Sequence, residues 1–219
     1  MATLSVEAGP LMDRIYRHQR LIYDISRRYY LLGRDQLIAG LAPGPGAAVL
    51  EIGCGTGRNL VHCARRYPEA HLHGLDVSTA MLETAGRALY RAGLTGRVRL
   101  GLADAARLDT ARLFGLPRFE RIFISYSLSM IPGWHEVVER ALAALASGGE
   151  LHIVDFGQQD GMPAWFRRLL FAWLRLFSVT PVVTLCWDLH MLAERHGATL
   201  DFRKLYRGYA VLAVLRKQA

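Results

Sequence analysis

The sequence has 219 residues, of which 52% are hydrophobic and 21% charged, so it is long enough for one domain and too apolar to be disordered throughout. Its 27 basic and 19 acidic residues give a formal net charge of +8, which favours a polyanionic partner, either nucleic acid or anionic lipid. Because all but two of the cations are arginine, genomic base composition is an alternative source of this charge.

Signals for export, membrane insertion and metal binding are absent from the sequence. No uninterrupted apolar run reaches the roughly 20 residues of a membrane-spanning helix, and the chain starts without the basic, apolar and small-residue pattern of a signal peptide. The three cysteines lack CxxC spacing, which argues against a disulfide framework and against a zinc cluster. We therefore expect a cytoplasmic protein with no metal site.

Residues 11–42 are expected to form an N-terminal helical cap. Three tyrosines recur every seven residues, at Tyr16, Tyr23 and Tyr30, and a step of seven keeps side chains on one stripe of a helix. Stacked tyrosine rings suit a methylated ammonium through cation–π attraction. An ordinary aromatic packing stripe is the alternative interpretation.

Between residues 45 and 156 short apolar runs alternate with helical patterns. Strands are expected at 47–52, 71–76, 97–102, 121–126 and 150–156, and helices at 58–67, 78–92 and 135–146. Repeated strand–helix units predict a parallel sheet that is covered by helices on both faces. The whole chain, 1–219, is expected to be one domain with this segment as its core.

The C-terminal part differs from this alternation. Between Pro163 and Pro181 a helical wheel gathers Arg167, Arg168 and Arg175 on one flank, and Phe, Trp and Leu fill most of the rest. This profile is typical of a helix that lies in a membrane interface, so we treat residues 160–190 as an amphipathic, membrane-facing segment. A helix packed on the core or on a second copy of the chain is the alternative.

The last segment, 198–216, contains two strand-like runs around Arg207-Gly208, and we expect an antiparallel hairpin there. From 163 to 219 the chain has nine basic and three acidic residues, so this tail holds +6 of the net charge of +8. The charge is therefore concentrated around the amphipathic segment, which favours a lipid surface.

The strongest motif is a glycine loop, Gly53-Cys54-Gly55-Thr56-Gly57, between an expected strand and an expected helix. Glycines permit a tight turn there and a close approach of the backbone to a ligand. The loop lacks the Gly-Lys-Ser/Thr of a P-loop, which argues against a triphosphate. Glu51 stands two residues before it and would suit a cationic ligand better than a pyrophosphate, although a dinucleotide-binding loop is the alternative.

Two further carboxylates follow the next expected strands. Asp76 ends the second strand, where it can accept hydrogen bonds from both hydroxyls of a ribose. Asp104 follows the third strand, within reach of an adenine amino group. Any one of these acids can be a helix cap or a solvated loop residue, but three at successive strand ends indicate one shared binding site.

Together, Glu51–Gly57, Asp76, Asp104 and the terminal hairpin resemble the class I S-adenosylmethionine-dependent methyltransferases over residues 45–216. The resemblance implies an α/β, Rossmann-like, seven-stranded and mostly parallel sheet with an antiparallel last strand, helices on both faces and an N-terminal helical cap. It implies S-adenosyl-L-methionine as methyl donor and S-adenosyl-L-homocysteine as product. The donor-binding residues that it implies are Glu51, Gly53, Cys54, Gly55, Thr56, Gly57, Asp76, Val77, Met81, Asp104, Ala105 and Ser125.

The acceptor is expected at the end of the fourth strand. Methyltransferases that act on base amino groups carry Asn/Asp-Pro-Pro-aromatic at this place, whereas this chain has Ser125–Pro132 without that motif. We therefore expect no nucleic-acid partner. Tyr126 and His135 flank the strand end and join the three tyrosines of the cap as catalytic candidates. A hydrogen-bonding residue at a helix start is the alternative for His135.

The patterns Met12–Asp35 and Ile124–Pro132 are similar to those of the bacterial betaine-lipid N-methyltransferases, which trimethylate diacylglyceryl homoserine. This resemblance implies an amino-lipid substrate, an anionic membrane surface on the inner face, and a partner that makes the homoserine lipid by aminocarboxypropyl transfer. The alternatives are a phosphatidylethanolamine methyltransferase, a quinone methyltransferase, and a catalytically silent donor-binding protein that docks on the membrane.

Overall fold

A computed structural model describes residues 31–176 and 179–218. Its strands are β1 (Ala48–Ile52), β2 (His71–Asp76), β3 (Val98–Leu102), β4 (Phe119–Ser125), β5 (Leu145–Phe156), β6 (Ala198–Leu205) and β7 (Ala210–Lys217). Its helices are α2 (Arg34–Leu41), α3 (Arg58–Arg66), α4 (Thr79–Arg91), α5 (Thr110–Phe114), α6 (Trp134–Ala143), α7 (Ala164–Arg175) and α8 (Leu185–Arg195). Three short 3-10 turns are η1 (Ala105–Arg107), η2 (Leu128–Met130) and η3 (Tyr206–Gly208).

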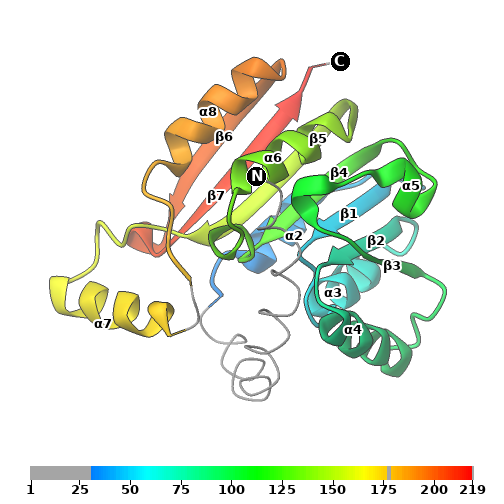
Figure 1. Ribbon diagram of the computed structural model, residues 1–219, viewed down its shortest axis with the longest axis horizontal. Helices are drawn as coiled ribbons and strands as arrows, with labels where there is room; N and C mark the ends of the chain where they lie inside the picture. Colours follow the sequence, from blue (N-terminus) through cyan, green and yellow to red (C-terminus); the bar gives the residue numbers. More distant parts are fainter. Residues whose placement is uncertain (1–30, 177–178, 219) are drawn as a thin grey trace, which may run out of the picture.

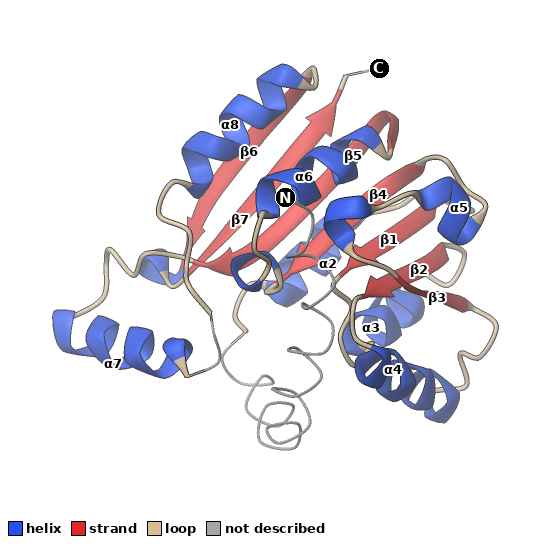
Figure 2. Ribbon diagram, viewed as in Figure 1, coloured by secondary structure: helices blue, strands red, loops and turns tan. Residues whose placement is uncertain are grey.

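The strands form one seven-stranded sheet in the order β3-β2-β1-β4-β5-β7-β6 (Figures 1 and 2). Strands β1 to β5 pair in parallel, whereas β7 is antiparallel to both β5 and β6. The expected Rossmann-like sheet with an antiparallel last strand is therefore confirmed. Parallel neighbours end at the same edge of the sheet, and the loops that follow β1, β2, β3 and β4 meet there.

Two hydrophobic clusters cover the two faces of the sheet. One packs residues of α5, α6 and α8 against one face, and the other packs residues of α2, α3, α4 and α7 against the opposite face. In Figure 1, α6 and α8 lie in front of the strands and α2 lies behind them. Because both faces are covered, the central strands β1 and β4 are buried along most of their length, as in other parallel sheets.

Helix starts follow the local sequence. Ser78 accepts a hydrogen bond from the Met81 amide at 3.3 Å and caps α4, as its hydroxyl predicts. Gly57 precedes α3 with φ of 75°, a backbone conformation that glycine adopts without strain. The glycine loop therefore ends where α3 begins.

The predicted strands and helices of the core are found, but α5 was not predicted, and β5 begins at Leu145, within the helix expected at 135–146, rather than at residue 150. The C-terminal part needs two further corrections. The single helix expected between Pro163 and Pro181 ends at Arg175, and α8, which was not predicted, follows after a break. The apolar side chains of the first helix were expected on one half of the wheel, but the structure divides them. Phe166, Leu170 and Trp173 pack toward the core, whereas others are exposed.

The N-terminal cap lies mostly outside the described residues. Within them it contributes α2, whose Leu37, Ile38 and Leu41 are buried against the sheet. The described helices include none that is long and apolar enough to cross a membrane. The same residues hold no group of three His, Cys, Asp or Glu side chains placed to bind a metal ion.

Gly74 in β2 allows α3 to pack closely on the sheet. A Cβ atom at this position would lie 2.5 Å from Leu60 Cδ1 and 3.1 Å from Cys54 Cβ. We predict that Gly74→Ala lowers the free energy of unfolding by about 1–3 kcal/mol, as overpacking of a filled core does. Urea denaturation measures this change, and a Gly74→Ala protein as stable as the parent would contradict the packing described.

A matched glycine serves as the control. Gly86 lies in the exposed middle of α4, with open space around its Cβ position. Gly86→Ala should raise the free energy of unfolding by about 0.5–1 kcal/mol, because alanine is the better helix former. The two substitutions are chemically identical and are expected to change stability in opposite directions.

Candidate active site

The sheet brings the predicted carboxylates to one edge. Glu51 lies near the end of β1, Asp76 is the last residue of β2, and Asp104 follows β3. Glu51 is 1% exposed and Asp76 is 9% exposed. Burying carboxylates is costly unless they are hydrogen-bonded or meet positive charge. Their partners within the protein therefore matter for what this edge can bind.

The glycine loop is held between β2 and β4. The amides of Gly53 and Cys54 both donate to the Leu75 carbonyl, each at 2.9 Å. Gly53 has φ of +71°, and a Cβ atom there would lie 2.6 Å from Ser127 Oγ. Glycine is therefore required at this position both by its backbone conformation and by the space available.

Asp76 ties the loop to the next helix. Its Oδ2 accepts a hydrogen bond from the Gly55 amide at 2.8 Å, and its Oδ1 accepts one from the Ser78 amide at 3.0 Å. Ser78 in turn caps α4. One carboxylate thus fixes the centre of the glycine loop and the start of α4.

Glu51 lies at the bottom of a hollow beside the loop. Its Oε1 accepts a hydrogen bond from Asn59 Nδ2 at 2.7 Å. The hollow is lined by Leu31, Arg34, Glu51, Gly53, Cys54, Thr56, Arg58, Asn59 and Ser125. Ser125 Oγ is buried there, and among the described residues it has no hydrogen-bond partner. The hollow therefore offers a buried carboxylate and a buried hydroxyl to a ligand.

Cys54 is a packing residue of this loop. It is 5% exposed, and burial, followed by the charges of Glu51 and Asp76, raises the pKa of its thiol well above the ordinary value. The thiol stays protonated at neutral pH, so it is no nucleophile. Among the other predicted donor-binding residues, Met81 is buried in the first turn of α4 and Ala105 is buried at the start of η1. Val77 lies between Asp76 and the α4 cap.

Tyr126 is buried directly after β4, with an unusual backbone. Its φ is 56°, a region that costs a bulky residue about 1–3 kcal/mol and that is often found at functional sites. Its hydroxyl donates to the Leu32 carbonyl, and its ring packs edge-on against Phe156 with centroids 4.7 Å apart. Burial, chiefly, raises the pKa of Tyr126, so the phenol remains neutral. These contacts give it a positioning role, because they connect the end of β4 with the segment before α2.

The structure does not bring His135 into the donor hollow. It lies at the start of α6, stacked on Trp134, and its Nε2 is 3.3 Å from Asp188 Oδ2 of α8. These residues line a separate hollow between α6 and α8, which shares no lining residue with the one at Glu51. The interpretation of His135 as a hydrogen-bonding residue at a helix start fits these contacts. Tyr16, Tyr23 and Tyr30 lie outside the described residues.

Asp155 near the end of β5 is a site residue that the sequence did not reveal. It is 2% exposed, and it accepts hydrogen bonds from the Ser129 amide at 2.9 Å and the Ser129 hydroxyl at 2.8 Å. These bonds hold the loop after β4, where an acceptor is expected. Arg34, Arg58 and Asn59 were also missed as lining residues. For Arg58 and Asn59 a signal was present, since both directly follow the glycine loop.

Comparisons with known proteins agree with this geometry. Residues 49–149 match a family model described as a methyltransferase domain. Ribosomal RNA small subunit methyltransferase C of Stutzerimonas stutzeri (strain A1501) is 32% identical over 158 residues, which are 69% of this chain and 43% of that protein. Over residues 49–149 the chain matches a methyltransferase domain, for which S-adenosylmethionine is the expected methyl donor.

Trans-aconitate 2-methyltransferase of Paracidovorax citrulli (strain AAC00-1) is 31% identical over 120 residues, or 54% of this chain and 42% of that protein. The chain thus spans less than half the length of the curated relatives named here. Among solved structures, an O-methyltransferase family protein from Burkholderia thailandensis has a TM-score of 0.69 at 17% identity, covering 94% of this chain and 62% of that one. This likeness confirms the fold of the methyltransferase domain.

The residues present fit S-adenosylmethionine, which is the expected cofactor of this domain. The donor is a cation at its sulfonium and its ammonium, and Glu51 supplies a buried carboxylate beside the glycine loop. Asp76, at the end of the neighbouring strand β2, is a second carboxylate at this edge that can accept from hydroxyl donors, and Asp104 caps η1 by accepting from the Ala106 amide at 3.0 Å.

We predict that Asp76→Ala weakens binding of S-adenosylhomocysteine about 10- to 150-fold, because hydrogen bonds to a charged group contribute about 1.5–3 kcal/mol. Isothermal titration calorimetry measures this change. Asp109→Ala is the control, because Asp109 is an exposed cap of α5 that accepts from the Arg112 amide at 3.0 Å. The control should lose a little stability and keep its donor affinity. Equal affinities of the two variants would contradict the role given to Asp76.

Proposed function

We propose that this chain is an S-adenosylmethionine-dependent N-methyltransferase that successively methylates the amine of diacylglyceryl homoserine to the trimethyl betaine lipid. In this proposal it acts as a peripheral protein on the cytoplasmic face of the inner membrane. Its amino-lipid substrate is supplied by an aminocarboxypropyl transferase. The resemblance of Met12–Asp35 and Ile124–Pro132 to betaine-lipid N-methyltransferases supports the acceptor, and the outer face of α7 supports the membrane location.

The observation that carries the membrane proposal is an apolar stripe on the outside of α7. Trp165 is 64% exposed, Leu169 is 64% exposed and Leu176, which directly follows the helix, is 70% exposed. These positions are four and seven residues apart, which places them on one side of a helix. Three large apolar side chains in water are costly for a protein, so the stripe indicates a surface that covers them.

The opposite side of α7 explains why the helix stays attached. Leu174 is 1% exposed, and Phe166, Leu170 and Trp173 pack against the cluster that also contains α2, α3 and α4. In Figure 1, α7 projects beyond the sheet, away from α5 and α8. The helix is therefore apolar on two sides, one of which is anchored to the domain while the other remains available for a lipid surface.

Charge favours a bilayer over a second copy of the chain as the partner of this stripe. Arg167, Arg168 and Arg175 are all exposed, and no acidic residue lies between Asp160 and Asp188. Arg168 and Arg175 flank the stripe, whereas Arg167 lies on the other side of the helix. Two copies facing each other through this stripe would therefore bring the Arg168 and Arg175 side chains of both copies together. An anionic leaflet offers opposite charge to the arginines and a place for the tryptophan and leucines.

The proposed reaction depends more on aligning the amine with the methyl group than on proton transfer. When bound, S-adenosylmethionine supplies a methyl group that is already activated by a sulfonium. A neutral amine carries its own lone pair, so no strong base is needed, and a neutral Tyr126 is consistent with that. The chain's part is to hold the amine in line for attack, which is worth up to about 7–11 kcal/mol in well-oriented model systems. Asp155 and Tyr126 position the loop and the segment that border this place.

An acceptor panel tests the proposal. The protein and labelled donor are incubated with one candidate lipid at a time. The candidates are diacylglyceryl homoserine, phosphatidylethanolamine and a demethylated quinone, and the products are resolved by mass spectrometry. We predict mono-, di- and trimethyl products from diacylglyceryl homoserine. If only phosphatidylethanolamine or only the quinone were methylated, the protein would be a methyltransferase for that lipid instead. Donor binding without any product would favour a catalytically silent protein.

The α7 stripe is tested by a triple substitution. We predict that Trp165→Ser, Leu169→Ser and Leu176→Ser together lower binding to anionic vesicles at least about tenfold, because each buried apolar side chain contributes about 1.5–3 kcal/mol when fully buried. The matched control is Val183→Ser, Trp187→Ser and Met191→Ser, which removes three exposed apolar side chains around α8 on the opposite face. Equal vesicle binding by the two triple variants would contradict the role of α7.

A further inference from the structure

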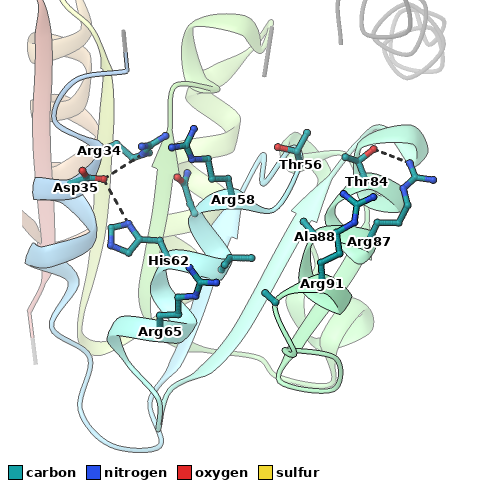
Figure 3. A pocket seen from close by; sticks show the side chains of 13 residues that line it. Arg34, Asp35, Thr56, Arg58, His62, Arg65, Thr84, Arg87, Ala88 and Arg91 are labelled. Carbon is teal, nitrogen blue, oxygen red and sulfur yellow. Dashed lines mark hydrogen bonds and ion pairs between the residues drawn. The ribbon is translucent and has the colours of Figure 1, made fainter. Parts of the chain in front are cut away.

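A large basic hollow lies next to the donor site and is not used by the proposed reaction. It has a volume of about 1080 Å³ and lies between α3 and α4, with the start of α2 at one end (Figure 3). Four residues line both this hollow and the donor hollow: Arg34, Thr56, Arg58 and Asn59. We refer to it as the arginine groove.

Two helices supply the walls of the groove in regular rows. Arg58, His62 and Arg65 are spaced by four and three residues along α3, and Thr84, Arg87 and Arg91 are spaced by three and four along α4. Such spacings place side chains on a single helix face. Figure 3 shows the α3 row and the α4 row on opposite sides of the hollow. Each row covers seven residue-to-residue steps, or about 10 Å of helix.

The charges in the groove are poorly balanced. Five arginines line it (Arg34, Arg58, Arg65, Arg87 and Arg91), and Asp35 is the only acid among the described lining residues. Asp35 Oδ1 lies 3.6 Å from Arg34 Nε and 3.7 Å from His62 Nδ1, so its charge acts on cations at the end of the groove formed by α2. Arg87 Nη2 donates to Thr84 Oγ1 at 3.2 Å, a bond that orients the guanidinium without neutralising it. Cations held together in this way attract anions.

We propose that the arginine groove binds the phosphate groups of an anionic phospholipid bilayer. The groove and α7 belong to the same layer, because residues of α2, α3, α4 and α7 share one hydrophobic cluster. One face of the domain thus presents both an arginine groove and an apolar stripe. Guanidinium groups bind phosphates with paired hydrogen bonds, which suits a row of lipid headgroups.

The groove lacks the features of a nucleic-acid site. Its described lining residues include no Phe, Tyr or Trp, whereas proteins that bind single strands use aromatic side chains as stacking platforms. Its apolar lining residues are instead small or branched, such as Val61 and Ala88. The choice of a bilayer rests on the proposed function, since it takes the membrane face of α7 as given, but phosphate binding by the groove is independent of methylation.

The test uses the three arginines that do not line the donor hollow. Arg65→Gln, Arg87→Gln and Arg91→Gln are combined, and binding is measured by vesicle co-sedimentation on phosphatidylcholine vesicles with and without phosphatidylglycerol. A basic residue near an anionic surface contributes about fivefold to partitioning, the equivalent of about 1 kcal/mol. We therefore expect about a hundredfold loss on phosphatidylglycerol vesicles, no change on pure phosphatidylcholine, and a smaller difference at high salt.

The control carries the same change of charge on other elements. Arg112→Gln, Arg118→Gln and Arg140→Gln remove three exposed arginines from α5, from the segment before β4 and from α6. This variant should keep most of its vesicle binding. Binding of S-adenosylhomocysteine by both variants verifies that they are folded, since none of the six positions lines the donor hollow.

Two results would overturn the proposal. One is equal loss of vesicle binding in both variants, which would show that only net charge matters. The other is groove-dependent binding of a single-stranded RNA that is tighter than vesicle binding at physiological salt, which would make the groove a nucleic-acid site. The vesicles contain neither methyl donor nor homoserine lipid. A failure of the groove therefore shows in co-sedimentation, and a failure of the proposed methylation shows in the acceptor panel.

Discussion

The carboxylate of Asp76 is the contact on which the donor side of the domain depends. It accepts hydrogen bonds from Gly55 in the loop after β1 and from Ser78 at the start of α4, so it joins the ends of two neighbouring parallel strands. Parallel strands place such groups together only because their carboxyl ends share one edge. The loop, the helix start and the buried Glu51 then surround one space, and the class of ligand follows from the negative charge at its base.

Much of the fold was predictable because a parallel sheet buried on both faces needs apolar runs, and glycine or proline marks their ends. The strand His71–Asp76 was predicted to the residue. Helix α8 was missed because its exposed Trp187 and Met191 blur the helical period set by the buried Leu185, Leu189 and Leu192. The division of the α7 side chains was missed for a related reason, since a wheel shows that residues are apolar but not which side the domain covers.

The site was predictable where function depends on a residue type at a strand end, as for Glu51 and Asp76. It was not predictable where function depends on distant partners. Asp155 holds Ser129 across 26 positions of sequence, and nothing near either residue signals the contact. The arginine groove is similar, because its two rows belong to separate helices whose charged faces meet only in the folded chain.

Backbone strain at Tyr126 is offset by the burial and the contacts of its own side chain. A bulky residue in the left-handed backbone region is strained, and glycine or asparagine would relieve that strain at the end of β4. Neither replacement could reach the Leu32 carbonyl that the tyrosine hydroxyl now contacts. Losing this fully buried ring would also cost about 3–5 kcal/mol of packing, more than the strain that is relieved, so the strained tyrosine stabilises the segment beside the donor hollow. A thermostable variant of this domain is best sought at positions other than 126.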